Sequence, residues 1–274
     1  MKSEEIRSHW EALAMTHGEE VLATTKTGTA KQIETGVLEK VFKLINPDED
    51  ASLRVLEAGC GNGVNIFSLA SSRKSWDFYG FDFATEMIRA AHARKSNLNF
   101  TNTTFGVSDF STPDVFGSDF DIIFTVRALI NLTTAHDQLA ALESLTNLLT
   151  PGGYLVFLEN FKDAHMNQNR MREILDLKPR KTADYNLFLD EKEIVNQLDK
   201  LGLEDIRVFN YSGLHDVLLY ILFPFLNDGE VNYSEEVVRI AALFTSRLEL
   251  NDMDNLGTFG QNRLVIARKP KKHS

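Results

Sequence analysis

The chain has 274 residues, of which 43% are hydrophobic and 25% are charged, proportions that are ordinary for a folded globular protein with a large core. Its 39 acidic and 29 basic side chains give a net charge of −10, which argues against a general binder of nucleic-acid backbones. Cys60 is the single cysteine, so an intrachain disulfide and a multi-cysteine metal site are excluded, and a reducing cytoplasm is expected.

Two amphipathic helices are predicted before residue 46. In the first, Ile6, Trp10 and Leu13 share one face, and Gly18 could end the helix. The second covers residues 30–45, after a loop at 24–29 and before a turn at 46–50. The first ten residues lack the apolar centre of a secretory signal, so we expect no export.

Short apolar strands then alternate with helices. Strands are predicted at 53–59, 76–82, 99–110, 119–126, 153–160, 203–211 and 262–270. Helices are predicted at 63–72, 84–95, 134–149 and 189–202. Strands that are apolar on both faces and separated by helices predict an α/β protein with a parallel sheet covered on each side.

Residues 211–260 form a long, mainly helical insertion before the last strand. It contains the longest apolar run, 217–226, which is too short to span a bilayer and includes Pro224. We expect a buried helix and no membrane association; a homodimer interface or a pocket wall are the alternatives.

The stretch VLEAGCGNG places Gly59, Gly61 and Gly63 at a strand-to-helix turn, where bare backbone lets a ligand approach closely. A dinucleotide fingerprint would need its third glycine at Val64. Glu57 would repel a pyrophosphate but suit a cation. The pattern therefore indicates a ligand with positive charge and no phosphate.

At every position EAGCGNG resembles the motif that closes the first strand of class I S-adenosylmethionine-dependent methyltransferases. Asp82 at the end of the second predicted strand, GVSDF at the end of the third, and LLTPGGYLVFLE before the fifth match further landmarks of this family in order. The resemblance implies a doubly wound, mostly parallel seven-stranded sheet flanked by helices. It also implies S-adenosylmethionine as cofactor.

In this family the acid at Asp82 holds both ribose hydroxyls, Asp109 accepts from the adenine amino group, and Phe83 and Phe110 lie against the ring. For both acids a helix cap is the alternative, and Cys60 is expected to fill the turn rather than act as a nucleophile. The resemblance implies a cofactor site of Glu57, Gly59, Cys60, Gly61, Gly63, Asp82, Phe83, Asp109, Phe110 and Arg127. No tight cluster of histidines and carboxylates predicts a metal site.

The donor arrives activated, so the family has no universal catalytic residue, and the acceptor site must be sought where this chain departs from the common core. The N/D-P-P-Y/F motif of enzymes that methylate amino groups of bases or amides is absent after the fourth strand, where Arg127 and Asn131 stand instead. Arg127 could bind an anionic acceptor or pair with a core acid.

Two further segments are candidates for the acceptor site. Residues 165–186 are rich in cations that could grip a phosphate or carboxylate, or simply cover a solvated helix: His165, Arg170, Arg172, Lys178, Arg180 and Lys181. In the insertion, His215 is a candidate general base, with a structural role as the alternative. Asp216 follows it directly, and neighbours on a helix are not expected to face each other.

We therefore expect a helical lid at 1–46, lined by Trp10, His17 and residues 24–27, and a Rossmann-like methyltransferase domain at 47–274 with a cap insertion at 211–260. The expected activity is methyl transfer from S-adenosylmethionine to an oxygen or nitrogen of a small anionic or sugar-like acceptor by in-line displacement. The alternatives are an RNA or protein methyltransferase and a non-catalytic protein that binds the cofactor.

Overall fold

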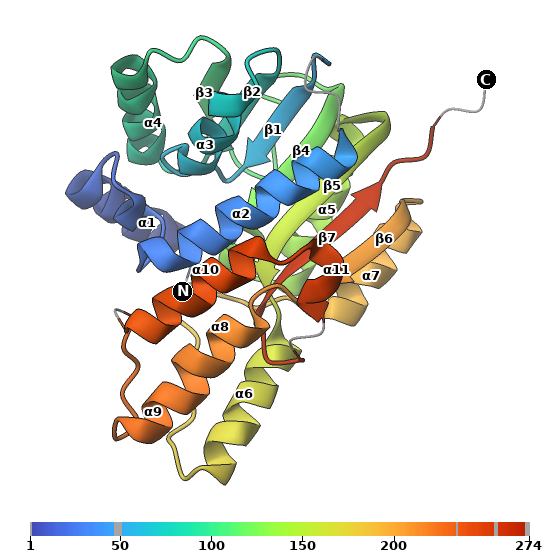
Figure 1. The fold of residues 1–274 in the computed structure, drawn as a ribbon. Coiled ribbons are helices and arrows are strands. Elements are labelled where there is room, and N and C mark those ends of the chain that lie inside the picture. Colours follow the sequence, from blue (N-terminus) through green and yellow to red (C-terminus); the bar gives the residue numbers. More distant parts are fainter. Residues whose placement is uncertain (1, 47–50, 234, 255–256, 272–274) are drawn as a thin grey trace.

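A seven-stranded sheet forms the centre of the computed structural model, which describes residues 2–46, 51–233, 235–254 and 257–271 (Figure 1). The strand order is β3-β2-β1-β4-β5-β7-β6; β1 to β5 are parallel, and β7 runs antiparallel to both of its neighbours. The predicted doubly wound, mostly parallel sheet is confirmed. The strands are β1 (Arg54–Ala58), β2 (Asp77–Asp82), β3 (Thr103–Val107), β4 (Phe120–Val126), β5 (Leu149–Asn160), β6 (Glu204–Phe209) and β7 (Asn262–Arg268).

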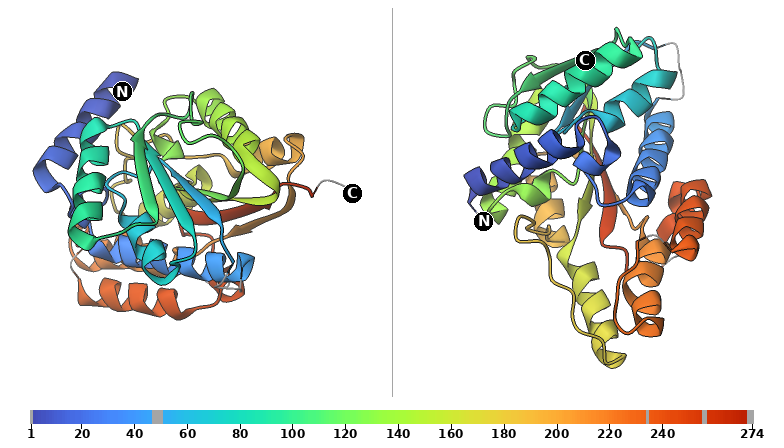
Figure 2. Two further views of the ribbon diagram at one scale, coloured as in Figure 1. Left: turned by 90° about the horizontal axis from the view of Figure 1, so that it is seen from above. Right: turned by 90° about the vertical axis from the view of Figure 1, so that its left-hand side faces the viewer.

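Helices cover both faces of this sheet (Figures 1 and 2). The longer ones are α1 (Ser3–His17), α2 (Gly28–Ile45), α3 (Val64–Ser72), α4 (Thr85–Leu98), α5 (Ala135–Leu148), α6 (Lys162–Ile174), α7 (Glu191–Lys200) and α10 (Glu236–Arg247). Short helices are α8 (Gly213–Val217), α9 (Phe223–Leu226) and α11 (Leu250–Met253), and Leu218–Leu222 forms a π-helical turn. Among the described residues, none of these helices has both the length and the apolar character that crossing a membrane requires.

The two faces of the sheet explain why its strands are apolar throughout. Adjacent residues of β1 point to opposite sides: Val55 joins a core with α2, α3 and α10, whereas Leu56 joins a second core with α5 and α7. Both side chains are fully buried. Burial on both faces removes the alternation of polar and apolar residues that a half-exposed strand would show.

Several element boundaries differ from the predictions, and two of the differences have a clear structural cause. The second helix begins at Gly28, because the Thr27 hydroxyl accepts a hydrogen bond from the Ala30 N–H at 3.3 Å and caps the helix two residues earlier than expected. Strand β5 begins at Leu149 and carries Gly152, with a φ of 87°, inside it. The pairing register of β5 against β4 is irregular, and this irregularity accommodates Gly152 inside the strand. The turn predicted at 46–50 lies, apart from its first residue, outside the described residues.

The insertion is helical, as predicted; Tyr220 and Tyr233 from it line a cavity at the strand ends, whereas α10 lies away from that cavity. Helix α10 lies along α2 (Figure 1), and the two approach so closely that a Cβ on Gly36 would lie 3.4 Å from the Ser246 Cβ. Helix α2 packs against one face of the sheet, as part of the core that contains Val55. At the strand ends, residues 2–46 contribute α1, the segment 18–27 and the first part of α2.

Candidate active site

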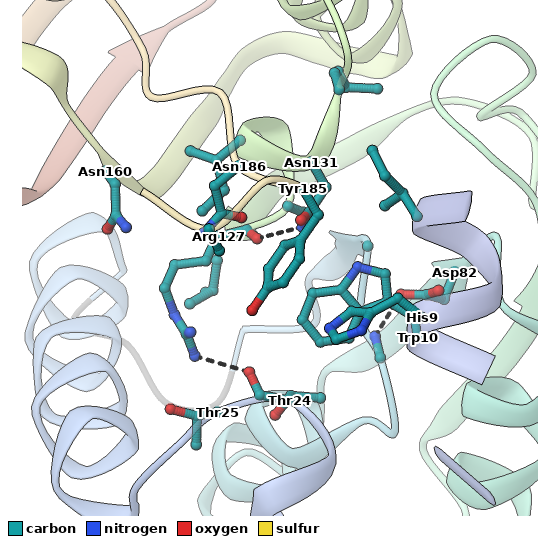
Figure 3. Close-up of a pocket in the computed structure, with 18 of the residues that line it drawn as sticks. His9, Trp10, Thr24, Thr25, Asp82, Arg127, Asn131, Asn160, Tyr185 and Asn186 are labelled. Atoms are coloured by element: carbon teal, nitrogen blue, oxygen red, sulfur yellow. Dashed lines mark hydrogen bonds between the residues drawn. The ribbon is translucent and has the colours of Figure 1, made fainter. Parts of the chain in front are cut away.

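A cavity of about 1180 Å³ opens where the carboxyl ends of β1, β2, β4 and β5 meet. Ligands of open α/β sheets bind at this edge. Its walls come from the glycine-rich turn, α1 and residues 22–34, the turn after β4, and residues 180–188, so segments far apart in the sequence enclose one space (Figure 3).

Two of the glycines line the cavity, and both need to be glycine. Gly59 has a φ of 73°, and a Cβ there would lie 2.5 Å from the Ala128 Cβ. Gly61 has a φ of 54°, and its Cβ would lie 2.7 Å from Thr24 Cγ2. The turn therefore presents backbone to a ligand, as the sequence predicted, and it also lies directly beneath the N-terminal segment.

Gly63 and Cys60 have mainly structural roles. Gly63 does not line the cavity; it is the N-cap of α3, and a Cβ there would lie 2.9 Å from the Phe67 ring. Cys60 lines the cavity but is buried and packs against Gly80 of β2. Burial raises the pKa of its thiol, so the side chain stays neutral and fills the turn.

The Asp82 carboxylate holds the glycine-rich turn in place. Oδ2 accepts from the Gly61 N–H at 2.8 Å, and Oδ1 accepts from the Ala84 N–H at 2.9 Å. Burial raises the pKa of Asp82 to about 6 despite these bonds. Each oxygen keeps a second acceptor site, and the residue lines the cavity, so it can accept from a diol there.

Asp109, Phe110 and Phe83 also line the cavity. Asp109 closes its own turn, because Oδ1 accepts from the N–H groups of Ser111 and Thr112 at 2.8 and 3.3 Å; this resembles the capping role that was the alternative for this residue. Phe83 packs with Trp10 and other apolar side chains under α1. The part of the cavity wall that the Phe83 and Phe110 rings form therefore lies between α1 and the ends of β2 and β3.

Glu57 leaves an acceptor unused at the cavity. It is 1% exposed; Oε1 accepts from Asn65 Nδ2 at 2.6 Å, and Oε2 has no partner. Burial raises its pKa to about 8. A buried carboxylate oxygen without a donor suits a cationic ligand such as the ammonium or sulfonium of S-adenosylmethionine, so the residues present fit this cofactor.

Arg127 pairs with an acid, which is the second of the two roles considered for it. Its Nε lies 2.5 Å from Glu34 Oε1, and its Nη2 donates to the Thr24 carbonyl at 3.2 Å. Burial disfavours the charge, but Glu34 outweighs it and raises the pKa of Arg127. The acid comes from α2 rather than from a strand, and Lys31 Nζ lies 2.9 Å from the same carboxylate. Arg127 still lines the cavity.

His215 does not line the cavity. It is buried, and its Nδ1 lies 3.0 Å from Asp216 Oδ1, so the expectation that these neighbours do not face each other is wrong. Nδ1 is the ring nitrogen nearest the backbone. Within the short helix α8 it can therefore reach the carboxylate of the following residue, Asp216. Asp216 also accepts from the Ser212 hydroxyl and the Gln261 N–H. The pair thus supports the structure, which argues against the catalytic role considered for His215.

Sequence reasoning missed an aromatic cluster at the cavity. The His9 and Tyr185 rings stack with their centroids 4.4 Å apart, and Trp10 meets Tyr185 edge-on at 5.7 Å. Figure 3 shows Tyr185 projecting between Arg127 and the two α1 rings. His9 Nε2 is buried without a partner, and burial lowers the pKa of the ring. No local pattern links residues so distant in the chain.

The comparisons with known proteins agree with this geometry. A family model described as a methyltransferase domain matches residues 49–200, more than half of the chain. The chain is a class I S-adenosylmethionine-dependent methyltransferase. The enzyme's methyl donor is S-adenosylmethionine, and the methyltransferase has no group of metal-binding side chains among its described residues.

The methyltransferase is similar to curated and solved proteins over most of its length. The ubiquinone biosynthesis O-methyltransferase of Psychrobacter arcticus (strain DSM 17307 / VKM B-2377 / 273-4) is 30% identical over 189 residues, 67% of this chain and 70% of that protein. The protein of the same name from Aliivibrio fischeri (strain MJ11) is 25% identical over 187 residues, 66% of this chain and 75% of that protein. The magnesium protoporphyrin IX methyltransferase of Synechocystis PCC 6803 superposes with a TM-score of 0.61 at 15% identity, covering 98% of this chain and all of that one, and so shares its fold.

Proposed function

We propose that this methyltransferase transfers the methyl group to an oxygen or nitrogen of a small anionic or sugar-like acceptor by in-line displacement. The observation that carries the proposal is the cavity of about 1180 Å³ at the strand ends. Pockets for one drug-sized ligand measure about 300–1,000 Å³, so this cavity has room for a donor and a small second molecule together. Lining side chains beyond the glycine-rich turn are mostly polar, with cations at Arg180 and Lys181.

Bound S-adenosylmethionine supplies an activated methyl group. The chain's own residues bind the two reactants, orient them and exclude water. Asp82 and Glu57 offer carboxylate oxygens, while Gly59 and Gly61 permit close approach of the backbone. Helix α1 covers the mouth with its aromatic face, where Trp10 and Tyr185 meet. Holding the two reactants in line converts a bimolecular step into an effectively unimolecular one, which speeds such a transfer.

A hydroxyl acceptor must also lose a proton, and three histidines line the cavity: His9, His17 and His165. Burial lowers the pKa of both His9 and His165, so both rings are neutral near pH 7 and can accept a proton. In each, Nε2 is buried without a partner. His9 and His165 therefore replace His215 as candidate bases. An anion-binding role for Arg127 stays a prediction.

The names of the curated relatives support a small-molecule O-methylation over the RNA and protein alternatives. The net charge of −10 and the volume of the cavity favour the same choice. A cytoplasmic location, a homodimer, and the division into a lid and a domain stay predictions.

The proposal is tested by incubating the protein with donor labelled in its methyl group and with separate small-molecule, RNA and protein fractions of the source cells. Mass spectrometry should find a labelled gain of one methylene in the small-molecule fraction. Label in RNA or protein alone would support those alternatives. Tight binding of S-adenosylhomocysteine with no label transferred to any fraction would support a non-catalytic binder.

A further inference from the structure

One end of the cavity lies away from the glycine-rich turn, beyond β4, where the ends of β5 and β7 meet α6, residues 178–188 and the insertion. Its members are tied together: Asn160 pairs with Asn262 across β5 and β7, and Arg180 Nη1 donates to Gln261 Oε1 at 3.1 Å. Figure 3 shows Asn160 on the opposite side of the cavity from Asp82. We define the distal pocket as Asn160, His165, Arg180, Tyr220, Gln261 and Asn262.

The distal pocket contains a guanidinium with no carboxylate partner among the described residues. The Arg180 guanidinium lies over the Tyr220 ring, 3.3 Å from its centroid, and its hydrogen bonds go to the neutral amides of Gln168 and Gln261. By contrast, several other buried or partly buried arginines have acids beside them, as Arg127 has Glu34. The same holds for Arg73 with Glu39 and for Arg263 with Asp163 and Glu191.

A second unpaired guanidinium lies behind the first. Arg172 is 4% exposed, and its bonds go to backbone carbonyls, from Nε to Lys178 at 2.7 Å and from Nη1 to Tyr220 at 2.5 Å. Burial and the charge of Arg180 lower the pKa of Arg172, and the same two causes lower the pKa of His165. Two cations that repel each other, with no acid between them, make this end of the cavity electropositive.

The carboxylate on the adjoining insertion does not relieve this charge. Asp216 is engaged by His215, by the Ser212 hydroxyl and by the Gln261 N–H. It forms no ion pair with either arginine. Neither Arg172 nor Arg180 therefore has a carboxylate ion-pair partner among the described residues.

The same pocket offers hydrogen-bond acceptors that have no donor. The Oδ1 atoms of Asn160 and Asn262 are buried without partners, and Asn160 is only 5% exposed. Asn131 Oδ1, after β4, is in the same state, while its Nδ2 donates to the Arg127 carbonyl. An amide oxygen can only accept, and buried polar atoms are ordinarily satisfied, so a ligand with hydroxyl groups fits these positions.

We propose that the distal pocket binds the acceptor, and that the acceptor is a polyhydroxylated molecule that carries a phosphate or a carboxylate. Its anion lies against the Arg180 guanidinium, whose planar fork suits both groups, and its hydroxyls donate to Asn160 and Asn262. The ring of Tyr220 packs beneath the guanidinium and orients it. This inference rests on the proposed methyl transfer and narrows its substrate to molecules that are both anionic and hydroxylated.

The test compares Arg180→Gln with a matched control, Arg170→Gln, because Arg170 is an exposed arginine of α6 that does not line the cavity. Both variants and the wild type are given labelled donor and the small-molecule extract, and the labelled product is run on an anion-exchange column and identified. We expect an anionic, hydroxylated product, and an acceptor KM raised about tenfold or more by Arg180→Gln alone, since it removes a charge-assisted contact. Treating the extract with phosphatase first abolishes the product if the anion is a phosphate and spares it if it is a carboxylate.

Affinity for S-adenosylhomocysteine, measured by calorimetry, should be the same in both variants and thereby shows that each is folded. Asn160→Asp is a second variant, which keeps an acceptor oxygen but adds a negative charge, so it should also raise the acceptor KM without changing that affinity. An uncharged product, or equal KM values for Arg180→Gln and Arg170→Gln, would overturn the inference and leave the methyl transfer standing. Absence of any labelled product contradicts the proposed function itself.

Discussion

The guanidinium of Arg127 and the carboxylate of Glu34 form an ion pair across 93 residues of sequence, with Nε and Oε1 2.5 Å apart. The same carboxylate holds Lys31, so one buried acid serves two cations at the wall of the cavity. Burial opposes the charge of Glu34, but Arg127 and Lys31 outweigh it and lower its pKa. This cluster joins α2 to the turn after β4, and both segments line the cavity.

Replacing Glu34 with Gln should destabilise the protein by about 2–3 kcal/mol. The substitution leaves Arg127 and Lys31 without an acid, and breaking a buried pair from one side costs about 3–5 kcal/mol, less here because the Arg127 side chain is 21% exposed. Urea unfolding measures the change. The control is Glu39→Gln on the same helix, whose pair with Arg73 is 38% exposed on the acid side and should matter by less than about 1 kcal/mol. Equal losses in both variants would contradict this account of the cluster.

Glu57 should make the donor-free protein less stable as pH rises. Its folded pKa of about 8 lies above the ordinary value of 4.5, so its contribution is fully present below about pH 4.5 and is lost as pH rises through about 8. Asp82 and Glu159, with pKa values raised to about 6 and about 7 by burial, act in the same direction over lower windows. Denaturant unfolding at pH 5, 6.5 and 8.5 should show the decline.

Glu57→Gln is the control for that decline. The amide oxygen can still accept from Asn65 but carries no charge, so the variant should be more stable than the wild type at pH 8.5, by on the order of 3 kcal/mol, and similar to it at pH 5. Parallel pH profiles for the two proteins would mean that Glu57 is already ionised at neutral pH.

Asp82→Asn should weaken binding of S-adenosylhomocysteine by about 10- to 100-fold. The amide loses the charge and replaces one acceptor with a donor, which then faces the N–H of Gly61 or of Ala84. Calorimetry gives the affinity. Asp77→Asn, at the exposed opposite end of β2, should leave it unchanged. If the two variants bind equally well, Asp82 does not contact the donor.

Local patterns were sufficient to predict the sheet and the donor side of the cavity. Gly59 and Gly61 lie in the turn after β1, and Asp82 is the last residue of β2, so the order of elements brings them to one edge. The prediction failed in detail where turn residues continue a strand, as Gly152 does in β5. An irregular register can absorb such residues, and that depends on the partner strand rather than on the local sequence.

The rest of the site depends on contacts between distant segments, which spacing along the chain does not encode. The stacking of His9 on Tyr185 and the pairing of Arg127 with Glu34 arise only when α1, α2 and the later loops pack together. Both His9 and Glu34 look like ordinary polar positions of amphipathic helices. The basic residues of 165–186 were found from sequence, but only the fold separates Arg180, inside the cavity, from the exposed Arg170.

Gly61→Ala should weaken binding of S-adenosylhomocysteine chiefly through Thr24. The new Cβ would lie 2.7 Å from Thr24 Cγ2, so the N-terminal segment must move off the glycine-rich turn, and a φ of 54° adds strain of about 1–2 kcal/mol. Thr24→Ser removes the clashing methyl group while keeping a hydroxyl to donate to the Val21 carbonyl. The double variant Gly61→Ala, Thr24→Ser should therefore recover part of the lost affinity. Thr27→Ser, which keeps the α2 cap and does not touch Gly61, should recover none in the same background. Equal recovery from both serine changes would mean that backbone strain alone, and not the contact with the N-terminal segment, explains the loss.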